Sequence, residues 1–184
     1  MKLWQKSADS LESVTRFTAG ADARMDEFLV RHDLVGSMAH IIMLEKVGLL
    51  TAGELQRLLT ELRSLYMAAT DGAFHMEQGV EDIHSQVELE LTRRLGDDGK
   101  KIHSGRSRND QVLVDLKLFL REELQSTVNQ INEVFYLMLD LSDRHRAVLL
   151  PGYTHFQLAM PSSFGLWFAG YAESLADDLL PLRA

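Results

Sequence analysis

The chain of 184 residues has no cysteine, which excludes disulfide bonds and thiol chemistry. It also lacks an apolar run of about 18 residues, the length that a membrane-spanning helix needs. Basic residues are outnumbered, and the formal net charge of −8 argues against nucleic-acid binding as the main role. The first residues show no basic segment followed by an apolar one, so no secretory signal is expected. These absences predict a cytoplasmic protein without a nucleic-acid or membrane partner.

Proline is rare, occurring only at 151, 161 and 181, and the apolar residues recur at helical spacing almost throughout. Helices are expected over 35–50, from the capping-box pattern that begins at Thr51, and over 80–95 until Gly96 ends the last one. In the first of these helices, the predicted core face carries Val35, Met38, Ala39, Ile42 and Met43.

From 111 to 150 there is no glycine and no proline, and apolar residues recur every three or four positions. This pattern predicts one helix of roughly 35 residues, about 50 Å long. A further helix is expected to start at Pro161 and to be apolar on nearly all sides, so neighbours must bury it. The predicted fold is therefore all-α: an N-terminal helical domain over 1–105, and the incomplete start of a long-helix central bundle over 106–184.

Residues 103–110 form the densest polar run of the chain and read His-Ser-Gly-Arg-Ser-Arg-Asn-Asp. Arg106 and Arg108 offer planar forks for carboxylates, and Gly105 allows close approach of the backbone to a ligand. Hydroxyls and an amide add neutral hydrogen bonds. The run predicts a site for an anionic small molecule. The alternative is an elaborate helix N-cap formed by Asn109 or Asp110, and the two roles are compatible.

A second polar run, Pro151-Gly-Tyr-Thr-His-Phe-Gln157, joins two predicted helices as a loop. It places His155 beside Thr154 and near Gln157. A lone histidine in a loop is more often structural than catalytic. The arginine-rich run elsewhere in the chain shifts the interpretation towards function.

These runs, KKIHSGRSRNDQV and PGYTHFQLAMP, resemble the argininosuccinate lyase family of the fumarase/aspartase superfamily. EDIHSQVE at 81–88 and DLVGSMAH at 33–40 are also similar to that family, and the resemblance extends from about Leu3 to Ala184. It implies reversible elimination of argininosuccinate to arginine and fumarate in arginine biosynthesis. It also implies a homotetramer built on long helices, with each site shared between subunits. No cofactor or metal ion is expected.

The resemblance also implies roles for individual residues. His155 is the expected catalytic residue, as base or as acid, because its ordinary pKa suits proton transfer near neutral pH. Arg108 and Asn109, with Ser107 nearby, are expected to stabilise charge that develops on a substrate carboxylate. Further substrate contacts are expected from Thr154, Gln157, Arg106 and His84. His103 is a weaker candidate, and a purely structural role for His84 or His103 is about equally favoured.

The sequence also differs from the family that it resembles. Members are more than twice as long, and their serine-bearing mobile loop has no counterpart here. The N-terminal motif is altered at 4–7, and a substrate-contacting serine has no clear match near 17–20. The chain is therefore expected to be the N-terminal part of a lyase and to be inactive and self-associating when isolated. The alternatives are an inert structural protein, as lens delta-crystallins are in this family, or another lyase of the superfamily.

Overall fold

A computed structural model describes residues 14, 17, 22–77 and 79–183, so the altered motif at 4–7 and residues 18–20 lie outside the described part. The described residues are mostly helical and contain one small two-stranded sheet, which confirms the all-α class. None of the helices in the described residues is both long and apolar enough to cross a membrane. Contacts divide the chain into unit 1, Met1–Phe119, and unit 2, Leu120–Ala184.

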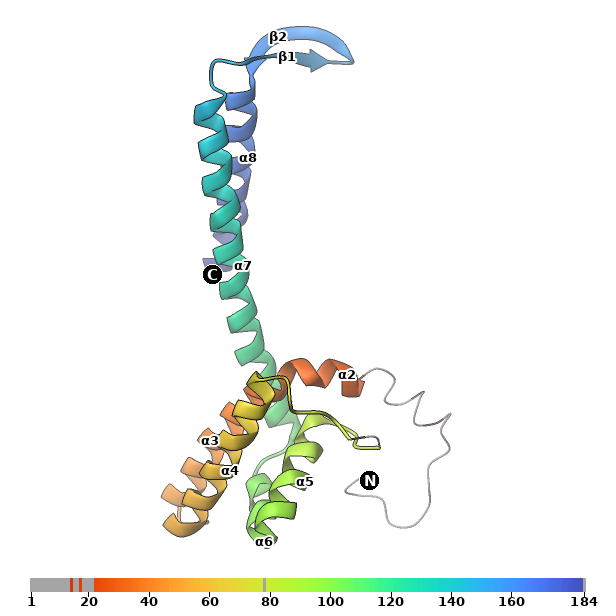
Figure 1. Cartoon of the computed structure of the whole chain (residues 1–184), viewed down its shortest axis with the longest axis vertical. Coiled ribbons are helices and arrows are strands. Elements are labelled where there is room, and N and C mark those ends of the chain that lie inside the picture. Colours follow the sequence, from red (N-terminus) through yellow and green to blue (C-terminus); the bar gives the residue numbers. More distant parts are fainter. Residues whose placement is uncertain (1–13, 15–16, 18–21, 78, 184) are drawn as a thin grey trace. The chain divides into compact units, whose positions relative to one another are not determined.

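Unit 1 is a group of short and medium helices, with α3 and α4 side by side (Figure 1). Its elements are α2 (Asp22–Asp26), η1 (Glu27–Leu29), α3 (Val30–Lys46), α4 (Ala52–Thr70), α5 (Ile83–Leu95), α6 (Asp97–Lys100), η2 (Lys101–His103) and the beginning of α7 (Arg108–Arg144). The core is aliphatic and consists of Val30, Leu34, Ile41, Leu44, Leu50, Leu58, Leu62, Leu65, Ile83, Val87, Leu91 and Ile102.

The helix ends of unit 1 follow the sequence signals closely. Thr51 and Glu54 form the predicted capping box at the start of α4, with reciprocal bonds between side chains and backbone. Asp82 caps α5 by accepting from the Ser85 backbone N–H at 2.8 Å. Gly96 ends that helix at φ 62°, in the left-handed region that glycine tolerates.

Replacing Thr51 with alanine is expected to lower the free energy of unfolding by about 1 kcal/mol, because the N–H of Glu54 loses its acceptor. Urea unfolding followed by circular dichroism measures the change. Thr60→Ala is the matched control, since Thr60 lies inside the same helix and only bonds back to the Gln56 carbonyl. Equal losses for both variants would contradict the capping role.

The predicted core face of α3 is wrong except at Met38, which is partly buried and packs against the core. Val35 is 41% exposed and Met43 is 42% exposed, while Leu34, Ile41 and Leu44 are fully or almost fully buried. The buried face also carries His32, Asp33 and Ser37. Apolar residues occupy two faces of this helix, and the face that packs is the one interrupted by polar side chains. Hydrophobic spacing alone therefore selects the outer face.

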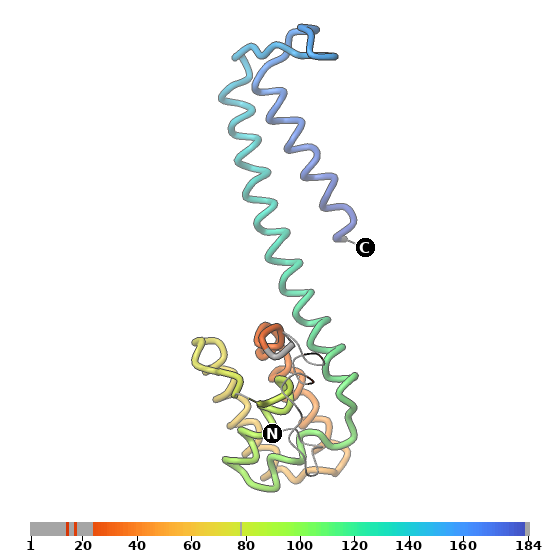
Figure 2. Tube along the Cα trace, turned by 90° about the vertical axis from the view of Figure 1, so that its right-hand side faces the viewer, coloured from red at the N-terminus to blue at the C-terminus, as the bar shows by residue number. Residues whose placement is uncertain are grey.

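Unit 2 consists of the rest of α7, the hairpin of β1 (Leu149–Thr154) and β2 (Gln157–Ser163), α8 (Phe164–Asp178) and η3 (Leu180–Arg183), and Figure 2 follows the trace. The expected long helix is real, with 37 residues, but it ends at Arg144 instead of continuing to 150. The expected loop is an antiparallel hairpin.

Pro161 does not start a helix, which corrects the sequence prediction. It lies in β2 opposite Pro151, at a position of a two-stranded sheet where a missing N–H is tolerated. The N-cap of α8 is Ser163, whose hydroxyl accepts from the Leu166 backbone N–H at 3.0 Å.

At Gly165, the backbone at the start of α8 lies directly against the backbone near the end of α7. A Cβ at Gly165 would lie 2.5 Å from the Arg146 Cα and 2.7 Å from the Ser142 carbonyl oxygen. The Ser142 hydroxyl donates to the Gly165 carbonyl at 2.8 Å. Only glycine fits this contact without a shift of the backbone.

Candidate functional site

The polar run at 103–110 is the turn that leads into α7, and Gly105 adopts φ 68° within it. Ser107 is the capping residue: its hydroxyl accepts from the Asn109 backbone N–H at 3.2 Å. The Asp110 carboxylate accepts in return from the Ser107 backbone N–H at 3.0 Å. The expected cap by Asn109 or Asp110 is therefore corrected to Ser107, with Asp110 as its reciprocal partner.

The two arginines of this run point back into unit 1. The Arg106 guanidinium donates to the Ser37 hydroxyl at 3.2 Å, and burial lowers the pKa of Arg106. Arg108 forms an ion pair with Asp82 and donates to the Ser85 hydroxyl at 3.0 Å. The exposed groups of the run are Ser104, Gly105, Ser107, Asn109 and Asp110. The turn thus has anchored cations and outward-facing neutral donors and acceptors.

His84 lies at the centre of a buried polar cluster. Its Nδ1 donates to Asp33 Oδ1 at 2.7 Å and lies 3.8 Å from Asp115 Oδ2. Burial opposes protonation of His84, but the hydrogen bond to Asp33 and three nearby carboxylates raise its pKa overall. Sequence reasoning named His84 and missed both acids. The signal that was missed is a charged residue on a helix face that packs against other helices. Asp33 lies on the buried face of α3, and Asp115 is a buried residue in the third turn of α7.

Burial raises the pKa of Asp115 to about 7, and the nearby Asp33 carboxylate adds to the rise while His84 and Arg106 oppose it. Ligand atoms of Asp33, His84 and Asp115 lie within 4.8 Å of one another. That spacing would suit a divalent cation, but the half-buried Arg106 already supplies positive charge to both carboxylates. We therefore assign no metal ion to the cluster.

The other histidines near the turn have backbone roles. His40 Nε2 is 2.9 Å from the Ser104 carbonyl, so α3 holds the turn at a second point. Burial lowers the pKa of His40. His103 is half-buried in η2, and its carbonyl accepts from the Arg106 backbone N–H at 3.4 Å.

His155 and Phe156 form the two-residue tip of the hairpin, and Thr154 pairs with Gln157 across it. Both tip residues have positive φ, 49° and 61°, as a type I′ turn requires. Such positions favour glycine or asparagine, so the backbone is strained by about 1 kcal/mol or more per residue. Thr154, His155 and Gln157 are all exposed. The strained tip presents the imidazole where a ligand can reach it.

Phe156→Gly is expected to stabilise the hairpin by roughly 0.5 to 1 kcal/mol, because glycine adopts this φ without strain. The ring is fully exposed at the tip, so little packing is lost within unit 2. Phe156→Ala is the matched control, since it removes the ring but keeps the Cβ. Amide exchange across the hairpin measures the change, and an equal gain in both variants would show that the ring, not the backbone, is responsible.

The predicted site residues fall in both units. Arg106, Arg108 and His84 all lie in unit 1, where Ser107 and Asn109 are exposed. Thr154, His155 and Gln157 belong to the hairpin of unit 2. Each group is brought together within its own unit.

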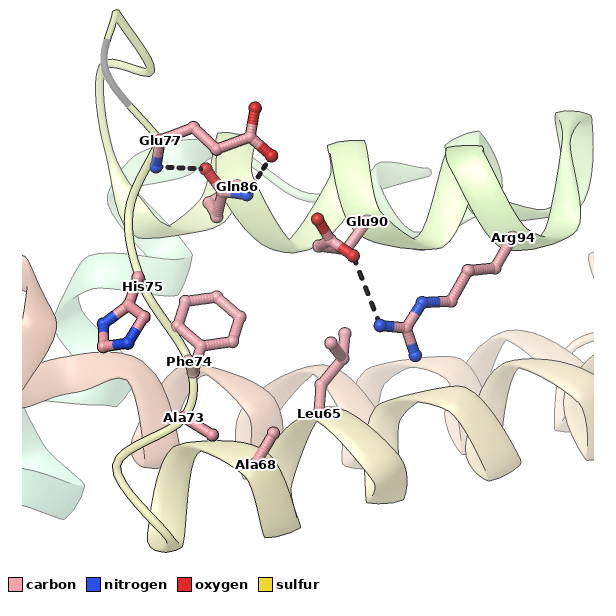
Figure 3. A pocket seen from close by; sticks show the side chains of 9 residues that line it. All are labelled: Leu65, Ala68, Ala73, Phe74, His75, Glu77, Gln86, Glu90 and Arg94. Atoms are coloured by element: carbon pink, nitrogen blue, oxygen red, sulfur yellow. Dashed lines mark hydrogen bonds and ion pairs between the residues drawn. The ribbon is translucent and has the colours of Figure 1, made fainter.

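A separate pocket of about 240 Å³ lies in unit 1 between α4, α5 and the segment before α5 (Figure 3). Leu65, Ala68 and Phe74 form its apolar wall. Several of its polar side chains are already paired: Gln86 accepts from the Glu77 backbone N–H at 3.0 Å, and Arg94 donates to Glu90 at 3.3 Å. None of the predicted site residues lines this pocket.

Comparison with known proteins decides the family. A family model described as lyase matches residues 6–184. The chain belongs to this lyase family of the fumarase/aspartase superfamily. This chain is 60% identical over 183 residues to an argininosuccinate lyase of Phocaeicola vulgatus and 42% identical over 182 residues to an argininosuccinate lyase of Stenotrophomonas maltophilia. These matches cover 100% and 98% of the chain but only 41% and 42% of those relatives.

Solved structures agree with this lyase-family fold. EDDS lyase in complex with formate matches 95% of the chain and 34% of its own length, with 26% identity and a TM-score of 0.66. A β-carboxy-cis,cis-muconate cycloisomerase of Acinetobacter calcoaceticus matches 91% of the chain and 41% of its own, with 18% identity and a TM-score of 0.67. The second likeness concerns the fold alone.

Proposed function

We propose that this chain is part of an argininosuccinate lyase, which cleaves argininosuccinate reversibly to arginine and fumarate in arginine biosynthesis in the cytoplasm. The observation that carries the proposal is the 60% identity to an argininosuccinate lyase along the whole chain. The outward-facing Ser107 and Asn109 and the exposed, strained His155 supply the types of group that this elimination needs.

The reaction breaks one C–N bond and one C–H bond of the substrate. A base removes the proton from the carbon beside a carboxylate, the electron pair forms the C=C bond of fumarate, and the guanidino nitrogen leaves with a proton from an acid. His155 takes one of these proton-transfer roles. In the proposed assembly, Asn109 and Ser107 of one subunit donate hydrogen bonds to the carboxylate on which charge develops, and Thr154 and Gln157 of another subunit hold the substrate beside their own His155.

Arg106 and Arg108 contribute mainly through their field and through the shape of the turn, because both guanidiniums are anchored in unit 1. Their charge raises the positive potential where a dicarboxylate binds, against the acidic net charge of the chain.

A chimaera tests the proposal at the level of the whole enzyme. In this chimaera, residues 1–184 of the present chain replace the matching part of the Phocaeicola vulgatus argininosuccinate lyase. Cleavage of argininosuccinate is followed by the absorbance of the fumarate that forms. Cleavage is expected, and His155→Ala is expected to reduce kcat by about a hundredfold or more. His75→Ala is the control, because His75 is an exposed histidine in the pocket of Figure 3. A folded chimaera without activity would favour the inert alternative.

The proposed assembly is a homotetramer in which the sites are shared between subunits. It is supported by the apolar side chains that α8 leaves exposed, among them Leu166 at 66%, Trp167 at 47% and Tyr171 at 51%. Soluble monomers rarely leave large apolar patches exposed, so these side chains are expected to be covered in an assembly. Light scattering across a concentration series is expected to show self-association of the chain, and a monodisperse monomer at every concentration would contradict it.

A further inference from the structure

The cluster of Asp33, His84 and Asp115 joins three helices of unit 1 at a buried point. Aliphatic side chains there would need no hydrogen-bond partners, whereas these polar side chains do. Asp33 comes from α3, His84 from α5 and Asp115 from α7, and the two acids are each 1% exposed. Gln111, one turn before Asp115, also approaches Asp33 Oδ1, at 3.5 Å. Gly36 on α3 faces α7, and a Cβ there would be in ordinary van der Waals contact with Asp115 Oδ1 at 3.5 Å.

This cluster is a poor device for stability alone. Among the described residues, no hydrogen-bond partner reaches Asp33 Oδ2, Asp115 Oδ2, Gln111 Oε1 or Arg106 Nε, and all four atoms are buried. Buried polar atoms without partners destabilise a fold, and apolar residues of similar volume would pack there more favourably. Polar groups kept in such a position point to a functional requirement.

The cluster is connected to the polar turn through Arg106. The Arg106 guanidinium reaches Ser37, one turn after Asp33 on α3, and its charge acts on both Asp33 and Asp115. A buried guanidinium needs nearby negative charge, and these two carboxylates supply it. Asp82 and Ser85, which lie close to His84 in the sequence at the start of α5, hold Arg108. The two arginines of the turn are thus anchored on α3 and on the start of α5, two of the elements that the cluster joins.

We propose that Asp33, His84 and Asp115 are positioning residues: through Arg106 and the first turns of α7 they fix the geometry of the turn that presents Ser107 and Asn109. His84 is hydrogen-bonded to Asp33 through Nδ1 and lies 3.8 Å from Asp115 Oδ2, so that its charge attracts both acids and α3, α5 and α7 form one support for the turn. This assignment rests on the proposed function only in taking the turn to bind substrate. The way in which the three residues hold the turn is a structural property of unit 1 and does not depend on that function.

Two substitutions of His84 distinguish this role from simple packing. In His84→Asn the side-chain nitrogen lies near the place of Nδ1, so the bond to Asp33 is kept. In His84→Gln it lies near the place of Nε2, so that bond is lost. Amide hydrogen exchange of the 184-residue chain then reports on the turn, through the backbone N–H groups of Ser104 and Arg106, which bond to Lys101 and His103 carbonyls.

His84→Gln is expected to speed exchange of the two turn amides at least tenfold, whereas His84→Asn stays within about threefold of the parent chain. Amides of Leu62 and Leu65 in the core of α4 are the internal control and should stay unchanged in both variants. Equal exchange in the two variants would overturn the proposal. So would acceleration of the α4 amides together with the turn, because His84 would then support the whole unit and not the turn.

The chimaera adds a kinetic measurement. His84→Gln is expected to lower kcat/KM for argininosuccinate about tenfold or more, His84→Asn to retain most of it, and Asp140→Asn, an exposed acid paired with Arg144 on α7, to leave it unchanged. An inactive parent chimaera would refute the proposed function while the exchange result still decides the positioning role. An active chimaera in which the Gln and Asn variants are equal would refute the positioning role alone.

Discussion

Replacing Gly165 with alanine is expected to destabilise unit 2 by about 3 kcal/mol or more. The added Cβ would meet two backbone atoms of the α7 end, the Arg146 Cα at 2.5 Å and the Ser142 carbonyl oxygen at 2.7 Å. Backbone atoms have no rotamer to change, so the start of α8 must move away from α7. That movement also breaks the hydrogen bond from the Ser142 hydroxyl to Gly165.

Gly170→Ala is the matched control, because it makes the same change in the same helix. A Cβ at Gly170 meets nothing within 4 Å, so this variant should gain up to about 1 kcal/mol from better helix propensity. Fluorescence of Trp167, in a Trp4→Phe background, follows urea unfolding of unit 2 directly. Similar midpoints for the two variants would mean that α8 does not pack on α7 through Gly165.

Asp115→Asn is expected to remove a pH dependence of stability from unit 1. The pKa of Asp115 is raised from 3.8 to about 7, so the folded chain binds this proton more tightly than the unfolded chain. The resulting stabilisation is complete below about pH 4 and is lost as the pH rises to about 7. Between about pH 5.5 and about pH 8 the loss amounts to about 2 kcal/mol.

Urea unfolding of the parent and of Asp115→Asn at these two pH values measures the difference. The groups that face Asp115 are Asp33, His84, Arg106 and, further away, Asp26. Those residues are present in both proteins, and the variant also lacks the contribution of Asp115 to the raised pKa of His84. Both effects remove proton uptake on folding, so the variant should gain stability relative to the parent as the pH rises. Asp140→Asn is the control on the same helix and should show no such trend. A relative stability that does not change with pH would show that Asp115 is ionised throughout.

The sequence was sufficient for features that depend on a few neighbouring residues. The Thr51–Glu54 capping box, the stop at Gly96 and the core residues Ile83, Val87 and Leu91 are all confirmed. Each depends on local backbone chemistry or on a stripe of one residue type. The long helix was likewise predicted, because no glycine or proline interrupts it.

Prediction failed where contacts distant in the sequence decide the outcome. The hairpin places Pro151 opposite Pro161, and two separated prolines give no local signal for pairing. The core face of α3 was misassigned because Asp33 and Ser37 face inward to meet His84 and Arg106, which come much later in the chain. The buried acids of the candidate site were missed for the same reason: a charged residue is read as solvent-exposed until its partners are known.

The continuity of α7 has a consequence for the order of folding. Gln111 and Asp115 are the only buried residues of α7, and both belong to unit 1, which is synthesised before unit 2. Starting a helix is unfavourable, with a nucleation constant on the order of 10⁻³, whereas each added residue costs little. Packing of these early turns in unit 1 therefore provides the helix nucleus. The remainder of α7 is expected to extend from this nucleus residue by residue, before α8 has been synthesised and can pack against it.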